Sequence, residues 1–158
     1  MGCDMVVALG RATVDGQTLF GQNSGLPMGE KQILCRIPGR EFAPGEKVHA
    51  QYIELLQARN TFTVLATKPD DWWGYCQGMN EHGVGMGCTV LQNKINCPEP
   101  GLTGGDLVRL ALERSHSARQ AVDLLGELIE RHGQSSPPGN CYPAGGDNGF
   151  LIADGAEA

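Results

Sequence analysis

Two helical segments follow one another late in the chain, and they constrain its fold more than any other feature. Residues 107–114 (LVRLALER) come after a capping pair, Thr103 and Asp106, and residues 121–133 (AVDLLGELIERHG) come after the capping box Ser117–Gln120. Each segment has one apolar face, so each helix has to bury that face against another layer. Strand-like segments precede the helices, and the sequence therefore predicts a helix pair packed on a sheet.

The apolar positions define which side of each helix we expect to be buried. In the first helix Leu107, Leu110 and Ala111 form the apolar stripe, and Arg109 and Glu113 are expected on the outside. In the second helix the expected buried positions are Val122, Leu125, Leu128 and Ile129.

Alternating and β-branched runs predict strands ahead of the helices. Residues 3–9 and 18–25 form a hairpin in this interpretation, because the Asp15–Gly16 pair between them is a hairpin-turn signal. An irregular strand and loop is expected over residues 26–47, which contain two Pro-Gly breaks. The runs HAQYIELL and TFTVLAT then read as a second strand pair joined by a turn at residues 57–60.

A glycine-rich stretch and a late apolar run complete the expected sheet. Asn80 begins a tight turn over residues 80–83, which leads into a strand over residues 84–91. Gly85 and Gly87 share one face of that strand, where a backbone or a ligand has to approach closely. The loop GQSSPPGNCYPAGGDN precedes a last strand, FLIAD, and the chain stops soon after it. We therefore expect residues 1–158 to be one domain that is truncated at its carboxyl end.

Composition narrows the class of protein. With 23 glycines, 9 prolines and only 6% aromatic residues, the chain is typical of a turn-rich α+β domain with an aliphatic core. The net charge of −6 argues against nucleic acid or an anionic membrane as a partner, since both need clustered Lys and Arg. No run is long enough to span a bilayer, and the start lacks a signal-peptide pattern, so we expect a cytoplasmic protein.

The six cysteines are expected to be reduced thiols, because no secretory signal is present. No CxxC pair occurs, which argues against a zinc site, although His82 and Cys88 could be neighbours. We expect no bound metal and no cofactor. Cys3 stands out because it begins the first strand, but a thiol needs a base to become a nucleophile. His49, His82, His116 and His132 are the candidates for a Cys–His dyad, and none lies in a segment that favours this role. If residues 1 and 2 are removed, the α-amine of Cys3 itself becomes the base.

Four blocks of the chain resemble the secernin and dipeptidase group of amino-terminal nucleophile hydrolases. The blocks are CDMVVALGRATVDGQTLFGQNSG, DDWWGYCQGMNEHGVGMG, GGDLVRLALERSHSARQAVDLLGELIERHGQ and DNGFLIAD. The resemblance implies an αββα four-layer sandwich with antiparallel sheets, of which this chain is the amino-terminal part. It implies hydrolysis of linear C–N amide bonds, in small peptides for the dipeptidase members, with Cys3 matching the family nucleophile.

The chain also departs from the pattern that it resembles. The family usually has a cation and a carboxylate after the second strand, where this sequence has the neutral Gln22 and Gly25, with Asn23 as a polar neighbour. Loss of both charges removes the field that lowers the pKa of the thiol. Gly2 stands between Met1 and the nucleophile, so it also has to leave.

Further residues are expected to support the site. Asn80 and Asn148 are candidates to stabilise the oxyanion, although Asn80 is equally suited to forming a turn. Trp72 and Trp73 are candidates to wall a substrate pocket, and the alternative is one core and one rim residue.

The sequence leaves three functional hypotheses. The first is a dipeptidase or amidohydrolase that acts through Cys3 on a small peptide or acyl amide. The sequence is also compatible with assembly of the chain into a homo-oligomer. The second is a non-catalytic, secernin-like cytosolic protein of regulated secretion. The third is lipid anchoring at Gly2 and Cys3, which the full acylation pattern does not support because residue 6 is Val.

Overall fold

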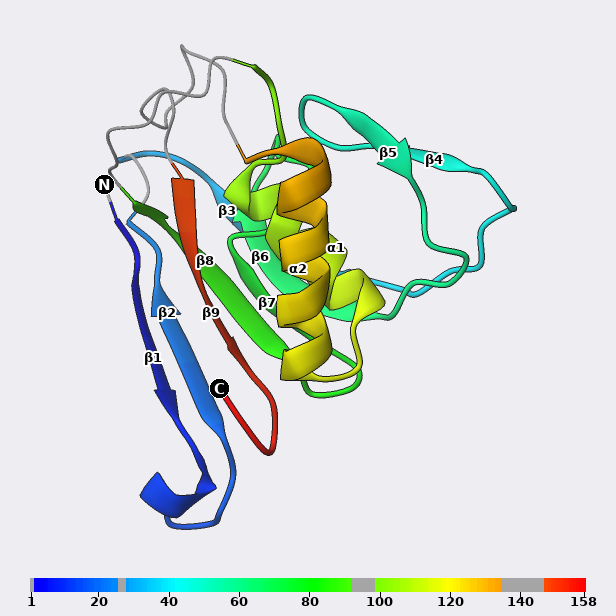
Figure 1. Ribbon diagram of the computed structural model, residues 1–158. Coiled ribbons are helices and arrows are strands. Elements are labelled where there is room, and N and C mark those ends of the chain that lie inside the picture. Colours follow the sequence, from blue (N-terminus) through cyan, green and yellow to red (C-terminus); the bar gives the residue numbers. More distant parts are fainter. Residues whose placement is uncertain (1, 26–27, 92–98, 135–146) are drawn as a thin grey trace.

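The computed structural model describes residues 2–25, 28–91, 99–134 and 147–158, which form a hairpin, a five-stranded sheet and a helix pair (Figure 1). The hairpin consists of β1 (Asp4–Ala8) and β2 (Leu19–Asn23), joined through a short 3₁₀ helix, η1 (Gly10–Ala12). The sheet has the antiparallel order β3 (Gln32–Ile37), β6 (Val64–Pro69), β7 (Gln77–Asn80), β8 (Gly85–Leu91), β9 (Asp147–Ala153). A small hairpin of β4 (Lys47–His49) and β5 (Glu54–Leu56) stands apart at the side of the sheet (Figure 1).

The helices α1 (Gly104–Arg114) and α2 (Ala118–His132) cover one face of the sheet, while β1 and β2 contact β8. The expected α+β class with antiparallel sheets is confirmed, and the described residues supply the helix, sheet and hairpin layers of the expected sandwich. Neither helix within the described residues is both long and apolar enough to cross a bilayer.

The capping pair of the first helix is confirmed, whereas the capping box expected at Ser117–Gln120 is only half formed, because Gln120 Oε1 accepts from the backbone N of His116 at 2.8 Å. Thr103 Oγ1 accepts from the backbone N of Asp106 at 3.1 Å, and the Asp106 carboxylate accepts from the backbone N of Thr103 at 2.9 Å. Ser117 Oγ accepts from the backbone N of Gln120 at 3.2 Å, and Gly133 ends α2 with a positive φ of 70°. These contacts satisfy amide groups that have no partner inside the helix.

The expected pairing of the middle strands is wrong. TFTVLAT contributes β6, which pairs with β3 and β7, whereas the end of HAQYIELL forms β5 and pairs with β4. The QILCRI run, expected to be irregular, is the regular six-residue strand β3. Pairing with β3 aligns Cys35 with Ala66 and Ile37 with Val64, so the small apolar side chains of both strands reach the helix layer together.

The core lies between α1, α2 and the helix-facing side of the sheet. Its fully buried members alternate along β6 and β8 and repeat along α1, and they include Val64, Val84, Met86, Leu107, Val108, Leu110, Ala111 and Leu112. The loop GQSSPPGNCYPAGGDN lies mostly outside the described residues.

Two expectations about the helix faces are wrong. Glu113 is 3% exposed, and its carboxylate accepts from Arg109 Nε at 2.8 Å and from the Tyr75 hydroxyl at 3.3 Å. Arg109 in turn lies over the Trp73 ring at 4.2 Å, so the pair is covered by aromatic side chains rather than by water. Val122 is 47% exposed, because α2 buries the narrower stripe of Ala121, Leu125 and Leu128.

Replacing Glu113 by Ala should lower the free energy of unfolding by about 3 kcal/mol, because Arg109 would remain buried without its carboxylate. Glu157→Ala is the matched control, since its pair with Arg119 is largely exposed and should contribute less than about 1 kcal/mol. Urea denaturation of both variants measures the difference. Equal effects of the two substitutions would contradict the structural role given to Glu113.

Candidate functional site

Cys3 lies directly before β1 and is held against the five-stranded sheet. Its backbone N donates a hydrogen bond of 2.8 Å to Oγ1 of Thr89 in β8, 86 residues away in sequence. The Cys3 residue is half-buried. A residue this close to a terminus would otherwise fray, so the contact with Thr89 fixes the position of the thiol.

The glycines of β8 allow the hairpin to approach. A Cβ on Gly85 would lie 3.6 Å from the side chain of Phe20, and a Cβ on Gly87 would overlap the Gln22 side chain. The expectation that these glycines share a face that is closely approached is confirmed, and side chains of β2 make the approach. Thr89 follows on the same face by the two-residue period of a strand. That period was the sequence signal that could have identified Thr89, which the sequence analysis missed.

Gln22 fastens β2 to the sheet. Its Nε2 donates to the carbonyl oxygens of Cys76 at 3.4 Å and Cys88 at 3.2 Å. Its Oε1 is buried and has no hydrogen-bond partner among the described residues. Gln22, which occupies the position of the family cation, therefore bonds to backbone carbonyl groups of Cys76 and Cys88. Among the described residues, no hydrogen bond joins Gln22 to Cys3.

The segment after β2 lies beside the start of the chain. Asn23 pairs with Asp4 in the hairpin register, one residue from Cys3. A Cβ on Gly25 would overlap the carbonyl oxygen of Gly2. Gly25 thus leaves room for the residue ahead of Cys3, and an aspartate there would require Gly2 to move or to be absent.

The other thiols near Cys3 are poor nucleophiles. Burial, followed by the charges of Cys3 and Glu30, raises the pKa of Cys76 to about 12. Burial also raises the pKa of Cys88, with smaller contributions from the charges of Cys76 and Cys3. These mutual effects put the three thiols within electrostatic range of one another. Because Cys76 and Cys88 stay protonated near neutral pH, neither can compete with Cys3 as a thiolate.

The structure does not bring Asn80 to Cys3. Its Nδ2 donates to the carbonyl oxygens of Leu112 at 2.9 Å and Ser115 at 2.7 Å, while its Oδ1 accepts from the backbone N of Val84 at 3.1 Å. Val84 is five residues from Thr89, about 17 Å along a strand. Asn80 therefore forms the turn between β7 and β8 and joins it to the end of α1.

Asn148 and Trp73 lie on the helix side. The Asn148 side chain is packed where a Cβ on Gly104, the first residue of α1, would fall. Trp73 contacts the core beneath Arg109, and Trp72 is half-buried. Cys3 instead approaches β8 through Thr89, on the face that Gly85 and Gly87 leave open to the hairpin. Neither Asn148 nor Trp73 is placed to contact a substrate held by Cys3, and the role expected of Trp72 stays a prediction.

The histidines and the acidic residues form no second site around the thiol. His49 pairs with Glu54 at 3.1 Å, while the rings of His82 and His116 pack with Phe62. No hydrogen bond or ion pair joins any of these histidines to Cys3 among the residues described. Within those same residues, no three His, Cys, Asp or Glu side chains gather as a metal would require.

An apolar groove that the sequence analysis did not identify lies next to Gln22. Its volume is about 280 Å³, and Phe20, Leu34, Leu65 and Met79 supply most of its apolar wall. Leu34 and Leu65 are 71% and 51% exposed, which is unusual for neighbouring leucines on a sheet. The groove lies on the hairpin side of the sheet, the side from which Cys3 reaches Thr89.

Comparisons with known proteins bear on the family and on the fold. Residues 46–136 match the sequence model of the family described as acyl-coenzyme A:6-aminopenicillanic acid acyl-transferase. A crystal structure of a mutant conjugated bile acid hydrolase from Clostridium perfringens matches 99% of this chain with a TM-score of 0.56 and 20% identity. This chain covers 46% of that protein. The fold is thus part of an amino-terminal nucleophile hydrolase fold, while the finer assignment to the secernin and dipeptidase group stays a prediction.

Gly87→Ala should displace the Gln22 side chain, because the added methyl group would occupy its position. The loss of the two hydrogen bonds from Gln22 should lower the free energy of unfolding by about 1–3 kcal/mol. The control is Gly85→Ala on the same face, where the new methyl group would make only ordinary contact with Phe20. Urea denaturation distinguishes them, and equal stability of the two variants would refute the role assigned to Gln22.

Proposed function

Because the chain belongs to the acyl-coenzyme A:6-aminopenicillanic acid acyl-transferase family, we propose that it is a cysteine-nucleophile hydrolase of linear amide bonds. Cys3 is the proposed nucleophile, after removal of residues 1 and 2. The observation that supports this most is the hydrogen bond from the Cys3 backbone N to Thr89 Oγ1, which fixes the nitrogen that would become the base.

The freed α-amine has the right chemistry for this role. Its ordinary pKa of about 7.7–8.0 leaves a substantial neutral fraction at pH 7–8. The Thr89 hydroxyl can accept one N–H of the amine, so the nitrogen lone pair remains available for the thiol proton. Thr89 is then a positioning residue, since it acts through the amine and not on the substrate.

The reaction follows from these two groups. The amine takes the proton of the Cys3 thiol, and the sulfur attacks the amide carbonyl carbon. The protonated amine gives its proton to the leaving nitrogen as the C–N bond breaks, which leaves a thioester on Cys3. Water, deprotonated by the same amine, then attacks the thioester carbonyl and releases the acid and the free thiol.

The groove beside Gln22 suggests the acyl part of the substrate. Its walls of Phe20, Leu65 and Met79 are apolar, so they favour an aliphatic or aromatic group next to the scissile bond. A small peptide with an apolar first residue, as a dipeptidase would cleave, fits this chemistry, and so does a simple acyl amide.

A second function, a non-catalytic binding protein of the secernin type, is favoured by one observation. Gln22 is neutral and is bonded to the backbone at Cys76 and Cys88, and position 25 is glycine. No charged side chain at these two positions would then stabilise a Cys3 thiolate.

Intact-mass measurement should show loss of Met1 and Gly2, and Cys3→Ala should abolish hydrolysis of small apolar acyl amides. Cys35→Ala is the control, since Cys35 lies on β3 with its thiol at 3.5 Å from the Ala66 carbonyl oxygen. In the active protein an alkylating reagent at pH 7.5 should label Cys3 far faster than Cys76 or Cys88. Retention of Gly2 with full activity in Cys3→Ala would exclude the proposal, and slow labelling of Cys3 would favour the binding protein.

Thr89→Val should lower kcat about 10- to 100-fold with little change in KM, because it removes one hydrogen bond that orients the amine. Thr89→Ser keeps the hydroxyl group and should restore most of the rate. A pH–rate profile of both variants tests the assignment, since the rate falls at low pH as the amine becomes protonated, and loss of the bond to the amine should move this acidic limb only in Thr89→Val. If Ser and Val at position 89 behave alike, Thr89 has no positioning role.

A further inference from the structure

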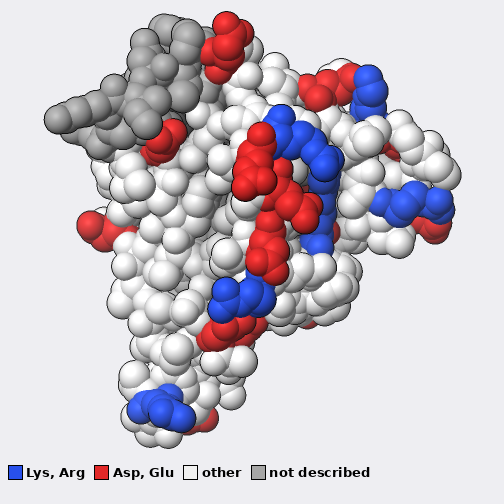
Figure 2. Space-filling model, viewed as in Figure 1, with Lys and Arg blue, Asp and Glu red and all other residues white. Residues whose placement is uncertain are grey.

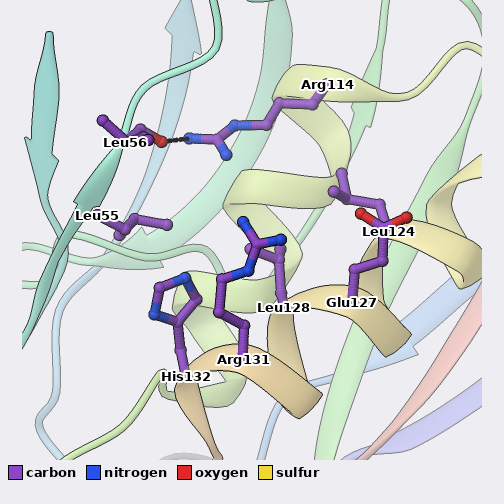
Figure 3. A pocket seen from close by; sticks show the side chains of 8 residues that line it. All are labelled: Leu55, Leu56, Arg114, Leu124, Glu127, Leu128, Arg131 and His132. Atoms are coloured by element: carbon purple, nitrogen blue, oxygen red, sulfur yellow. Dashed lines mark hydrogen bonds between the residues drawn. The ribbon is translucent and has the colours of Figure 1, made fainter. Parts of the chain in front are cut away.

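A small pocket on the helix side gathers basic side chains in a protein whose net charge is −6. It has a volume of about 180 Å³ and lies between β5 and the two helices. Arg114, Arg131 and His132 line it, and Glu127 is its acidic residue (Figure 3). In Figure 2 a band of basic atoms runs between the end of α2 and the β4–β5 hairpin.

Arg114 is held in the pocket without a charged partner of its own. Its Nη2 donates to the Leu56 carbonyl oxygen at 3.4 Å and to Gln57 Oε1 at 2.8 Å, and both acceptors are neutral. Its Nε is buried and has no hydrogen-bond partner among the described residues. The neighbouring Glu113 is bonded to Arg109 and Tyr75. A guanidinium group taken out of water in this way is costly unless an anion joins it.

Arg131 and His132 add positive charge from the last turn of α2. A cation there offsets the helix dipole, which explains why basic residues lie at this end of the helix. It does not explain why both lie in the pocket that Arg114 enters from α1 (Figure 3). Arg131 forms no hydrogen bond or ion pair within the described part of the chain, although Glu127 is one turn away.

The remaining walls are apolar. Leu55 of β5 and Leu124 and Leu128 of α2 form them, and Leu55 and Leu128 are 5% and 6% exposed. A ligand that matches the pocket therefore has an anionic head for the arginines and a short aliphatic group for the leucines. The volume is too small for a nucleotide or a peptide, since drug-sized ligands occupy about 300–1,000 Å³.

We propose that this pocket binds a short-chain carboxylate, whose two oxygens pair with the guanidinium groups of Arg114 and Arg131. Planar guanidinium groups bind carboxylates in a bidentate geometry. The two arginines and Glu127 together carry a charge of one positive unit, which a monovalent carboxylate neutralises. This site is independent of Cys3 and stands whether or not the chain is a hydrolase.

The charge state of His132 favours a carboxylate over a phosphate dianion. Burial, followed by the charges of Arg131 and Arg114, lowers the pKa of His132 below its ordinary value. The imidazole is therefore neutral at pH 8, and the pocket then lacks the second positive charge that a dianion requires. The groups that face it are Arg114 from α1 and Glu127 and Arg131 from α2, while β5 contributes only leucines.

The test is a titration of the whole chain at pH 8 with butanoate, acetate and inorganic phosphate, followed by the imidazole proton signal of His132. Butanoate should bind saturably and more tightly than the other two, and it should raise the pKa of His132, because a bound anion stabilises the imidazolium. Tighter binding of phosphate, or no saturable shift with any of the three, would overturn the proposal.

Variants assign the binding to this pocket. Arg131→Gln should weaken butanoate binding about tenfold, and Glu127→Gln should strengthen it, because one removes and the other adds net positive charge. Both side chains project from the surface of α2, so neither change should unfold the protein. Arg119→Gln, at the other end of α2 and paired with Glu157, is the control and should leave binding unchanged. Equal binding by the variants at positions 119 and 131 would refute the site.

Discussion

The contact between the amino-terminal hairpin and β8 is the constraint on which the candidate site depends. Gln22 can lie against the sheet only because residue 87 has no side chain, Phe20 packs beside Gly85, and Thr89 meets the backbone of Cys3. A β-hairpin alone is marginally stable, so this packing is what gives the start of the chain a fixed position. If the α-amine of Cys3 is the base for the Cys3 thiol, both groups belong to the terminal residue. A fixed position of that residue is then needed to hold the thiol and the amine in place.

Polar groups buried on the other face connect the sheet to the helices. Asn80 bonds the β7–β8 turn to the end of α1, while Glu113 and Arg109 join α1 to Tyr75 and Trp73. Satisfied polar groups of this kind stabilise one arrangement of the layers, because any shift would leave a buried charge or amide unpaired. Residues that looked suited to catalysis or to the helix surface therefore have structural roles.

The two candidate sites lie on opposite faces of the sheet. The hairpin face holds Cys3 and the apolar groove. The helix face holds the basic pocket, where Arg114 from α1 meets Arg131 and His132 from α2. The sheet and its core lie between them, so a ligand in one site does not touch the other.

The amino-acid sequence by itself determined both helices, their N-cap residues Thr103 and Ser117, the presence of the amino-terminal hairpin, the turn at residues 80–83 and the strand that follows it, although the hairpin connects through η1 and not through a tight Asp15–Gly16 turn. Each of these depends on residues that are neighbours in the chain, so capping, turn and alternation signals were enough to predict them. Only the tertiary structure decided that β6 pairs with β3, that Glu113 is buried, that Thr89 holds Cys3 and that Arg114 enters a pocket with Arg131. Those outcomes depend on contacts between segments far apart in the chain, whose partners no local pattern specifies.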